Sequence, residues 1–266
     1  RYTAYRKDRQ DREVKILTET TAMFTVSVLV AVLYVIFCGI QIIYLFGGGG
    51  ELPAGVTYAE YARQGFFQLL VVCILNLGTV LTMEHFFQRN RAVDAVLTVI
   101  SVCTIIMTAS SGWRMILYIR AYQLTFLRVV VLVALAVITL LMAGTICYIW
   151  NRRFPLFQYG MAVVCVSYVL FAFAHVDAGI AAYDLAQIEN GNTAGDYSYL
   201  SCLSTDAAPV IAEYLKEHPD KSYYGDGIYN WKWEYMQEND RMNQPVTLRT
   251  FNLSYLRAKR IFSEKQ

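Results

Sequence analysis

Residues 129–151 read VVVLVALAVITLLMAGTICYIWN and contain no Asp, Glu, Lys or Arg across 23 positions. An α-helix rises ~1.5 Å per residue, so about 20 apolar residues cross the ~30 Å hydrocarbon core of a bilayer. Four further stretches of 19 to 31 residues also lack these charges: residues 20–50, 64–83, 95–113 and 154–176. The chain is therefore predicted to be all-α, a polytopic transmembrane helix bundle with five spans and a small C-terminal α-helical extramembrane domain.

The composition agrees with a membrane protein and excludes one class of partner. Hydrophobic residues make up 56% and charged residues 17% of the chain, whereas a soluble domain has ~45–50% and ~25%. Residues 177–266 carry 9 Lys and Arg against 13 Asp and Glu. This mildly acidic tail offers no basic face of the kind that nucleic acid requires, so we expect membrane lipids, and no nucleic acid, as partners.

The uncharged stretches predict three parts. Residues 1–22 are expected to form a cytoplasmic juxtamembrane segment, residues 23–176 the bundle, and residues 177–266 an extracytoplasmic helical tail domain. Within the bundle the predicted spans are 23–46, 66–83, 93–110, 129–150 and 156–176.

The orientation follows from the positive-inside rule, which counts Lys and Arg in short loops and flanks. The N-terminal segment and the loops on the same side of the predicted bundle carry ten such residues, whereas the opposite loops carry four. We therefore expect a cytoplasmic N-terminus, an extracytoplasmic tail and a location in the cell membrane.

Residues 113–128 have a composition unlike that of the spans. At 100° per residue, polar and aromatic side chains fall on one side of a helix and apolar ones on the other. The pattern predicts an interfacial helix or a helical extension of the third span. The polar side consists of Arg114, Tyr118, Tyr122, Thr125 and Arg128, and the apolar side of Ile116, Ile119 and Leu127.

No motif indicates a metal, a cofactor or a catalytic residue. Five of the six cysteines lie in the uncharged stretches, singly and far apart along the chain, which is typical of small packing residues. His85, His175 and His218 have no Cys or carboxylate at ligand spacing. The sequence contains no HExxH motif, no phosphate-binding loop and no Ser, His and Asp grouping.

Two blocks of sequence resemble a known family. Residues 41–48 (QIIYLFGG) with residues 52–67 (LPAGVTYAEYARQGFF) form the first block, and residues 114–128 (RMILYIRAYQLTFLR) form the second. Both are similar to the bacterial multi-pass membrane family called domain of unknown function 4173, although Gln123 stands where that pattern has glycine and Arg120 where an acidic residue is common. The resemblance implies a bacterial inner- or plasma-membrane protein and no particular mechanism.

Both blocks are expected on the outer side of the membrane, where they offer polar groups at helix ends. We expect Glu60 to pair with Arg114 or Arg128 and to hold the glycine-rich loop over the bundle; the alternative is that each arginine only extends to lipid headgroups. The predicted ligand or partner site consists of Glu60, Arg63, Arg114, Tyr118, Tyr122 and Arg128.

Three functions are compatible with these features. The first is a non-catalytic envelope scaffold or sensor that binds a protein partner through its outer face and its Tyr- and Trp-rich tail, since such residues are enriched at interfaces. The second is a transporter or channel subunit. The third is a membrane enzyme acting on lipid or envelope precursors, with Glu60, Arg63 and Arg114 as its polar groups.

Overall fold

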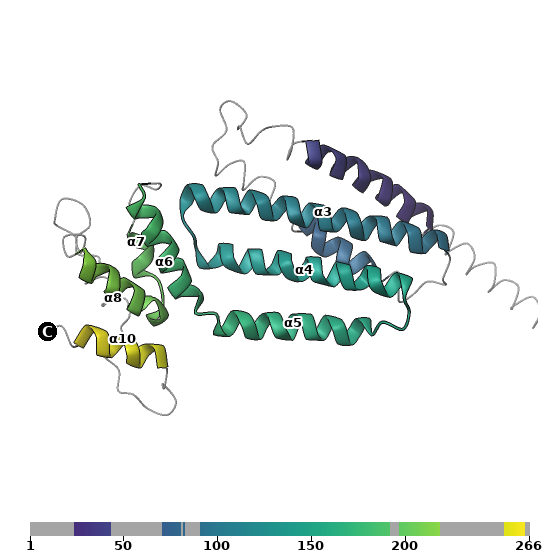
Figure 1. The fold of residues 1–266 in the computed structure, drawn as a ribbon. Coiled ribbons are helices and arrows are strands. Elements are labelled where there is room, and N and C mark those ends of the chain that lie inside the picture. The colour runs from purple at the N-terminus through teal and green to yellow at the C-terminus, as the bar shows by residue number, and fades with distance from the viewer. Residues whose placement is uncertain are drawn as a thin grey trace, which may run out of the picture. The chain divides into compact units, whose positions relative to one another are not determined.

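The computed structural model describes residues 24–43, 71–80, 82, 91–191, 197–218 and 253–263. All regular structure in these ranges is helical, which confirms the predicted all-α class (Figure 1). The described elements are the helices Phe24–Ile43 and Val71–Val80, α3 (Arg91–Tyr122), α4 (Phe126–Trp150), α5 (Leu156–Phe173), α6 (Val176–Glu189), α7 (Ser198–Ser201), the 3-10 turn η1 (Thr205–Ala207), α8 (Ala208–Glu217) and α10 (Leu253–Ser263).

Four described helices are long and apolar enough to cross a membrane: Phe24–Ile43, α3, α4 and α5. They coincide with four of the five predicted spans, so the chain is a multi-pass membrane protein. The remaining predicted span, 66–83, is described as the shorter apolar helix Val71–Val80. In a bilayer core each helix must satisfy its own backbone hydrogen bonds. Threonine hydroxyls inside these helices accordingly donate to carbonyls of the preceding turn, as Thr98 does to Asp94 at 2.7 Å.

Two helix ends differ from the prediction. The third helix continues to Tyr122, well past the predicted bound at residue 110. Residues 113–122 are therefore the helical extension of the third span that was one of the two predicted alternatives. The fifth span ends at Phe173 instead of 176. His175 adopts left-handed backbone angles, φ 46° and ψ 52°, and separates α5 from α6.

The chain divides into two compact units. The first comprises Arg1–Ile116 and Leu132–Cys165, and the second comprises Leu117–Val131 and Val166–Gln266. The division falls inside α3, α4 and α5, so the second unit contains the turn between α3 and α4 as well as the tail helices.

In the first unit, helices distant in the sequence share buried sulfur-rich packing. Cys38, Cys73 and Cys103 come from three different helices and lie in one hydrophobic cluster with Met107 and Met142. The sequence did not indicate that these cysteines lie close together, because they are far apart along the chain. Thiols and thioethers are polarizable and fill irregular gaps between helices, which agrees with the packing role expected for these three cysteines. Cys147 and Cys165, for which the same role was expected, are exposed.

Polar side chains within the first unit link its helices. The Asn76 amide donates to the Thr104 hydroxyl at 2.9 Å, and both side chains are buried. Thr108 of α3 and Thr139 of α4 share a hydrogen bond of 3.0 Å. Hydrogen bonds of this kind stabilise helix association in lipid by ~0.6–2 kcal/mol each.

Helix α5 packs on α4 through a tyrosine seated against a glycine. The Tyr159 hydroxyl donates to the Leu140 carbonyl at 3.0 Å. A Cβ added at Gly144 would lie 2.2 Å from Tyr159 Cε1. The absent side chain at Gly144 therefore makes room for the ring.

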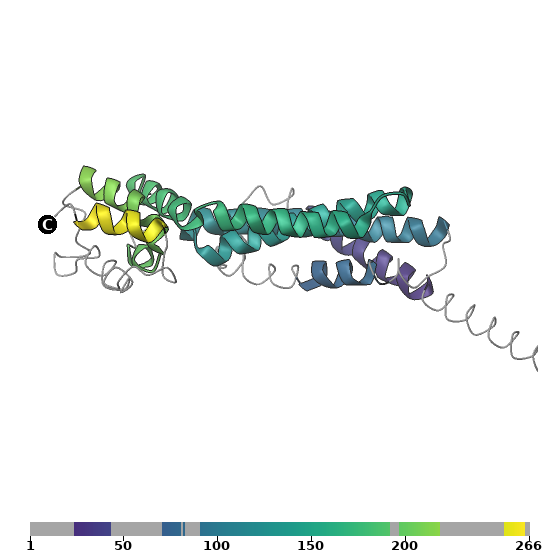
Figure 2. The same ribbon diagram turned by 90° about the horizontal axis from the view of Figure 1, so that it is seen from below.

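The second unit has a hydrophobic core of its own. Helix α6 packs against α8 and η1, and α10 packs against α8 and η1 (Figures 1 and 2). The buried centre includes Ile180, Leu185, Leu200 and Ile211, each at most 3% exposed. Burial of several aliphatic side chains at ~1.5–3 kcal/mol each provides the main stabilisation of this unit.

The local signals in the tail predict its described helices well. Ser204 caps η1 by accepting from the Asp206 backbone N–H at 3.4 Å, and Pro209 lies in the first turn of α8, which ends at Glu217. Residues 219–252 and 264–266 of the predicted tail domain lie outside the described residues.

Candidate functional site

Arg114 belongs to the first unit, where its side chain is half-buried. Its Nη2 donates to the Gln41 side-chain oxygen at 2.7 Å. Ser110 donates to the same oxygen at 3.3 Å. Arg114 thus joins α3 to the helix Phe24–Ile43 by a charge-assisted hydrogen bond, which is roughly twice as strong as a neutral one.

Three other predicted site residues, Tyr118, Tyr122 and Arg128, meet in the second unit. The Arg128 guanidinium lies 4.1 Å from the centroid of the Tyr118 ring, in cation–π contact. The rings of Tyr118 and Tyr122 are 5.2 Å apart. The predicted face is thus only partly present: Tyr118 and Tyr122 share one face of α3, but the helix ends at Tyr122, and Arg128 reaches their rings from the start of α4.

Glu60 and Arg63 lie outside the described residues. The proposed pair between Glu60 and either arginine remains a prediction. Among the described residues, Arg114 donates to the Gln41 side chain, and Arg128 contacts backbone carbonyls and the Tyr118 ring.

The turn between α3 and α4 needs partners from other elements because its backbone departs from the helix. Gln123 has φ 72°, in the left-handed region that favours glycine, and its side chain is buried. Arg128 Nη1 donates to the Tyr122 carbonyl at 2.9 Å and also to the Gln123 carbonyl. Gln123 therefore adopts a left-handed conformation at a position where the family pattern that this sequence resembles has glycine.

Two tail side chains complete this turn. The Leu124 N–H donates to Asp184 Oδ1 of α6 at 2.7 Å. The Phe126 N–H, at the start of α4, donates to the Tyr199 hydroxyl of α7 at 2.9 Å. We call the group Arg128, Asp184 and Tyr199, with the backbone of residues 122–126 that it binds, the turn cluster.

Asp184 is the most unusual titratable group of the turn cluster. It is 1% exposed, and its Oδ2 is buried with no hydrogen-bond partner among the described residues. Burial raises the pKa of Asp184 to about 6, although the Leu124 N–H and the positive charge of Arg128 act in the opposite direction. Burial also raises the pKa of Tyr199, against the hydrogen bond from Phe126; the charges of Asp177, Asp184 and Cys202 add to the rise.

The prediction from sequence missed Asp184, although a signal was present. Ile180, Asp184 and Ile188 are spaced by four residues and share one face of α6. A carboxylate between two isoleucines on the packing face of an amphipathic helix must find a buried donor. The identity of that donor, an N–H 60 residues earlier, could not be read from the spacing.

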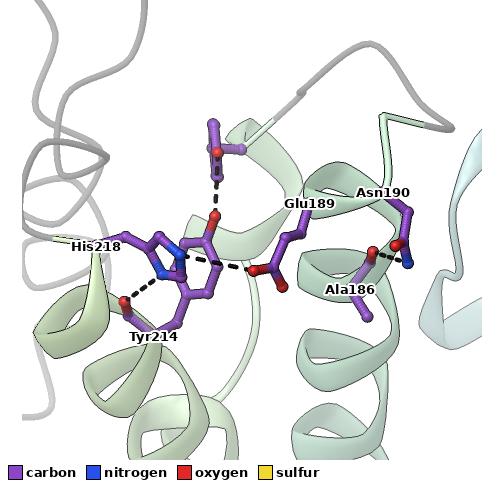
Figure 3. Close-up of polar contacts among 6 residues, drawn as sticks. Ala186, Glu189, Asn190, Tyr214 and His218 are labelled. Atoms are coloured by element: carbon purple, nitrogen blue, oxygen red, sulfur yellow. Dashed lines mark hydrogen bonds and ion pairs between the residues drawn. The ribbon is translucent and has the colours of Figure 1, made fainter.

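A second polar group joins the ends of α6 and α8 (Figure 3). His218 Nε2 lies 3.6 Å from the Glu189 carboxylate, and the His218 ring stacks on Tyr214 with centroids 4.7 Å apart. The hydroxyls of Tyr214 and Tyr197 are 3.5 Å apart. Burial, with this contact, raises the pKa of Tyr214.

These arrangements can hold protons and join elements, but they do not assemble a metal centre. Within the described ranges no three His, Cys, Asp or Glu side chains are placed to hold a metal ion. A metal ion or cofactor that needs three such ligands has no site there. The observed chemistry of the turn cluster is therefore the hydrogen bonding of a buried carboxylate, a guanidinium and a phenol to a turn.

A family model described as domain of unknown function (DUF4153) matches residues 2–214. The match agrees with the unknown-function family implied by the resemblance, but the family number is 4153 and 4173 is not supported. Comparison with curated proteins and with solved structures gives no match.

Proposed function

The chain belongs to the DUF4153 family, a domain of unknown function, and from this premise we propose that it is a non-catalytic scaffold or sensor of a bacterial cell membrane. In this proposal the helical tail, on the extracytoplasmic side, binds a protein partner. The transmembrane helices anchor the tail and receive its changes of state.

The observation that carries the proposal is the turn cluster. Asp184 of α6 and Tyr199 of α7 bind backbone N–H groups of the turn and of the first residue of α4. Because α3 and α4 continue from this turn as transmembrane helices, a shift of α6 would act directly on their ends. The bond from Leu124 to Asp184 is part-buried, so loss of its acceptor costs up to the ~1–3 kcal/mol of a fully buried N–H, and the turn and α6 are expected to move together.

The separate core of the second unit supports a binding role. Its helices bury their own apolar face and leave charged side chains of α8, such as Glu213 and Lys216, exposed. A folded module with exposed charged side chains, joined to membrane helices, is compatible with a receptor or scaffold.

A transporter or channel subunit is the second candidate, and one observation favours it. Helix α3 carries a row of buried hydroxyl residues: Ser101, Thr104, Thr108 and Ser111. The first three donate to carbonyls of their own helix, whereas the Ser111 hydroxyl has no hydrogen-bond partner among the described residues. Solute flux into proteoliposomes containing the protein, reduced by Ser111→Ala, would favour this candidate over the scaffold.

Site-specific photo-crosslinking in native membranes tests the main proposal. A photoreactive residue at Ala182 of α6 or Glu213 of α8, both exposed, should capture the same discrete protein. The matched control is Phe157 of α5, which is 81% exposed in a transmembrane helix and should capture lipid only.

The Asp184→Ala variant provides the second control, because it removes the acceptor for the Leu124 N–H while leaving both crosslinking positions in place. Crosslinking of a common protein from the tail positions, weakened in this variant, is the expected result. Absence of any protein adduct at Ala182 and Glu213, or equal capture at Phe157, would contradict the proposal.

A further inference from the structure

We propose that Asp184 is a proton-binding site whose occupancy sets how firmly α6 is held on the turn between α3 and α4. The inference goes beyond the proposed function, because it concerns the second unit itself and holds whether or not the tail binds a partner.

The geometry makes one oxygen of Asp184 structural and leaves the other for a proton. Oδ1 accepts the Leu124 N–H at 2.7 Å, a bond that a neutral carboxylic acid can also accept through its carbonyl oxygen. Oδ2 is buried, with no hydrogen-bond partner among the described residues. An ionised carboxylate with an unsatisfied buried oxygen is costly, whereas the protonated form removes the charge from this apolar environment.

The neighbours of Asp184 set the balance between its ionised and its protonated form. Arg128 of α4 favours the ionised carboxylate, but its Nη1 already donates to the Tyr122 and Gln123 carbonyls. On α7, the electrostatic partner is the Tyr199 phenol, which accepts from Phe126. The ionisable side chains Glu213, Lys216 and Glu217 of α8 are exposed, so solvent screens their effect on Asp184.

The two ends of α6 carry further titratable contacts. His175 Nδ1 lies 3.6 Å from the Asp206 carboxylate of η1, and His218 lies 3.6 Å from Glu189. Each is an ion pair only when the imidazole is protonated. The test must therefore separate the contribution of these two contacts from that of Asp184.

The sign of the pH effect follows from linkage. The pKa of Asp184 is raised from 3.8 to about 6 in the folded unit, so between these values the folded state binds a proton that the unfolded state has released. Stability of the docked α6 therefore rises as pH falls through about 6, and levels off below about 4. The second unit should be firmest in weakly acidic medium and looser at neutral pH.

Hydrogen exchange of the full-length protein in lipid nanodiscs tests the proposal. We expect protection factors of the α6 amides, corrected for intrinsic exchange rates, to increase about tenfold or more from pH 7.5 to pH 5.0. Amides in the centre of α4 serve as the internal reference and should not change. A pH-independent protection of α6 in the unmodified protein would overturn the proposal without recourse to any variant.

Two variants assign the effect to its source. Asp184→Asn keeps the acceptor for Leu124 without a charge, so α6 should show at pH 7.5 the protection that the unmodified protein reaches at pH 5.0. The double variant His175→Gln/His218→Gln should keep most of the pH dependence. If the histidine variant abolishes the pH dependence, or Asp184→Asn retains all of it, Asp184 is not the proton site.

Discussion

Substitution of Gly144 by alanine is the sharpest test of the contact between α4 and α5. The added Cβ would lie 2.2 Å from Cε1, 2.5 Å from Cδ1 and 3.2 Å from Cζ of Tyr159. Carbon atoms are at their best separation near 3.5–4.0 Å, so the ring must retreat by more than ~1 Å. The Tyr159 ring is held by the hydrogen bond from its hydroxyl to the Leu140 carbonyl. It also packs against the Phe154 ring, with ring centroids 5.1 Å apart.

The magnitude follows from three contributions. Overpacking of a well-fitted contact costs about 1–3 kcal/mol, and displacement of the Tyr159 hydroxyl costs about 1 kcal/mol more. Replacement of a helical glycine by alanine stabilises the helix by about 1 kcal/mol, in the opposite direction. Gly144→Ala should therefore destabilise the protein by about 1–3 kcal/mol and lower its melting temperature by about 3–10 °C.

Thermal unfolding in one mild detergent, followed by tryptophan fluorescence, measures this change. Gly112→Ala in α3 is the matched control, because a Cβ there meets no atom within 4 Å; it should raise the melting temperature by about 2–4 °C. In a Tyr159→Ala background, Gly144→Ala should also become stabilising, since the obstructing ring is gone. If Gly144→Ala stabilises the unmodified protein as Gly112→Ala does, or still destabilises it without the ring, the inferred contact is wrong.

The remaining predictions concern helix pairing and orientation. In a double-mutant cycle, the stability losses of Asn76→Ala and Thr104→Val should couple by about 0.6–1.7 kcal/mol. The control is Thr79→Val, which should be additive with Thr104→Val because the Thr79 hydroxyl bonds its own helix. Additive losses for Asn76→Ala and Thr104→Val would refute the interhelical hydrogen bond. Single cysteines at the exposed residues Asn151 and Asn190, in a cysteine-free background, test the orientation predicted from Lys and Arg. An impermeant maleimide applied to intact cells should label position 190 only, and labelling at 151 would reverse the orientation.

The site was predicted in part from sequence. The helical period placed Tyr118 and Tyr122 on one face with Arg128. The structure brings these three side chains together, although the helix ends at Tyr122 and Arg128 belongs to α4; their role as a ligand or partner site stays a prediction. The helical period also grouped Arg114 with these side chains. In the structure Arg114 instead donates a hydrogen bond to Gln41, 73 residues earlier in the chain. Asp184 and Tyr199 were missed because their acceptor role depends on donors about 60 to 73 residues away, and no local pattern encodes such a distance.

The membrane class, the helical character and the approximate positions of the spans follow from the amino-acid sequence alone. A charged side chain and an unpaired backbone group are both expensive in hydrocarbon, and a helix satisfies its hydrogen bonds within a few residues. An uncharged stretch of sufficient length therefore predicts a transmembrane helix from the local sequence alone.

The exact ends of the helices and the pairing of distant polar groups depend on how the elements pack in space. The sequence placed the third span at 93–110 and left open whether a helical extension follows. In the structure α3 continues past Arg114, which donates to Gln41, and ends at a turn that Arg128 and Asp184 stabilise. The left-handed His175 after α5 likewise faces Asp206, 31 residues later. Helix formation depends on neighbours in the chain, whereas these ends depend on neighbours in space, and their free energy exists only after the distant elements have packed.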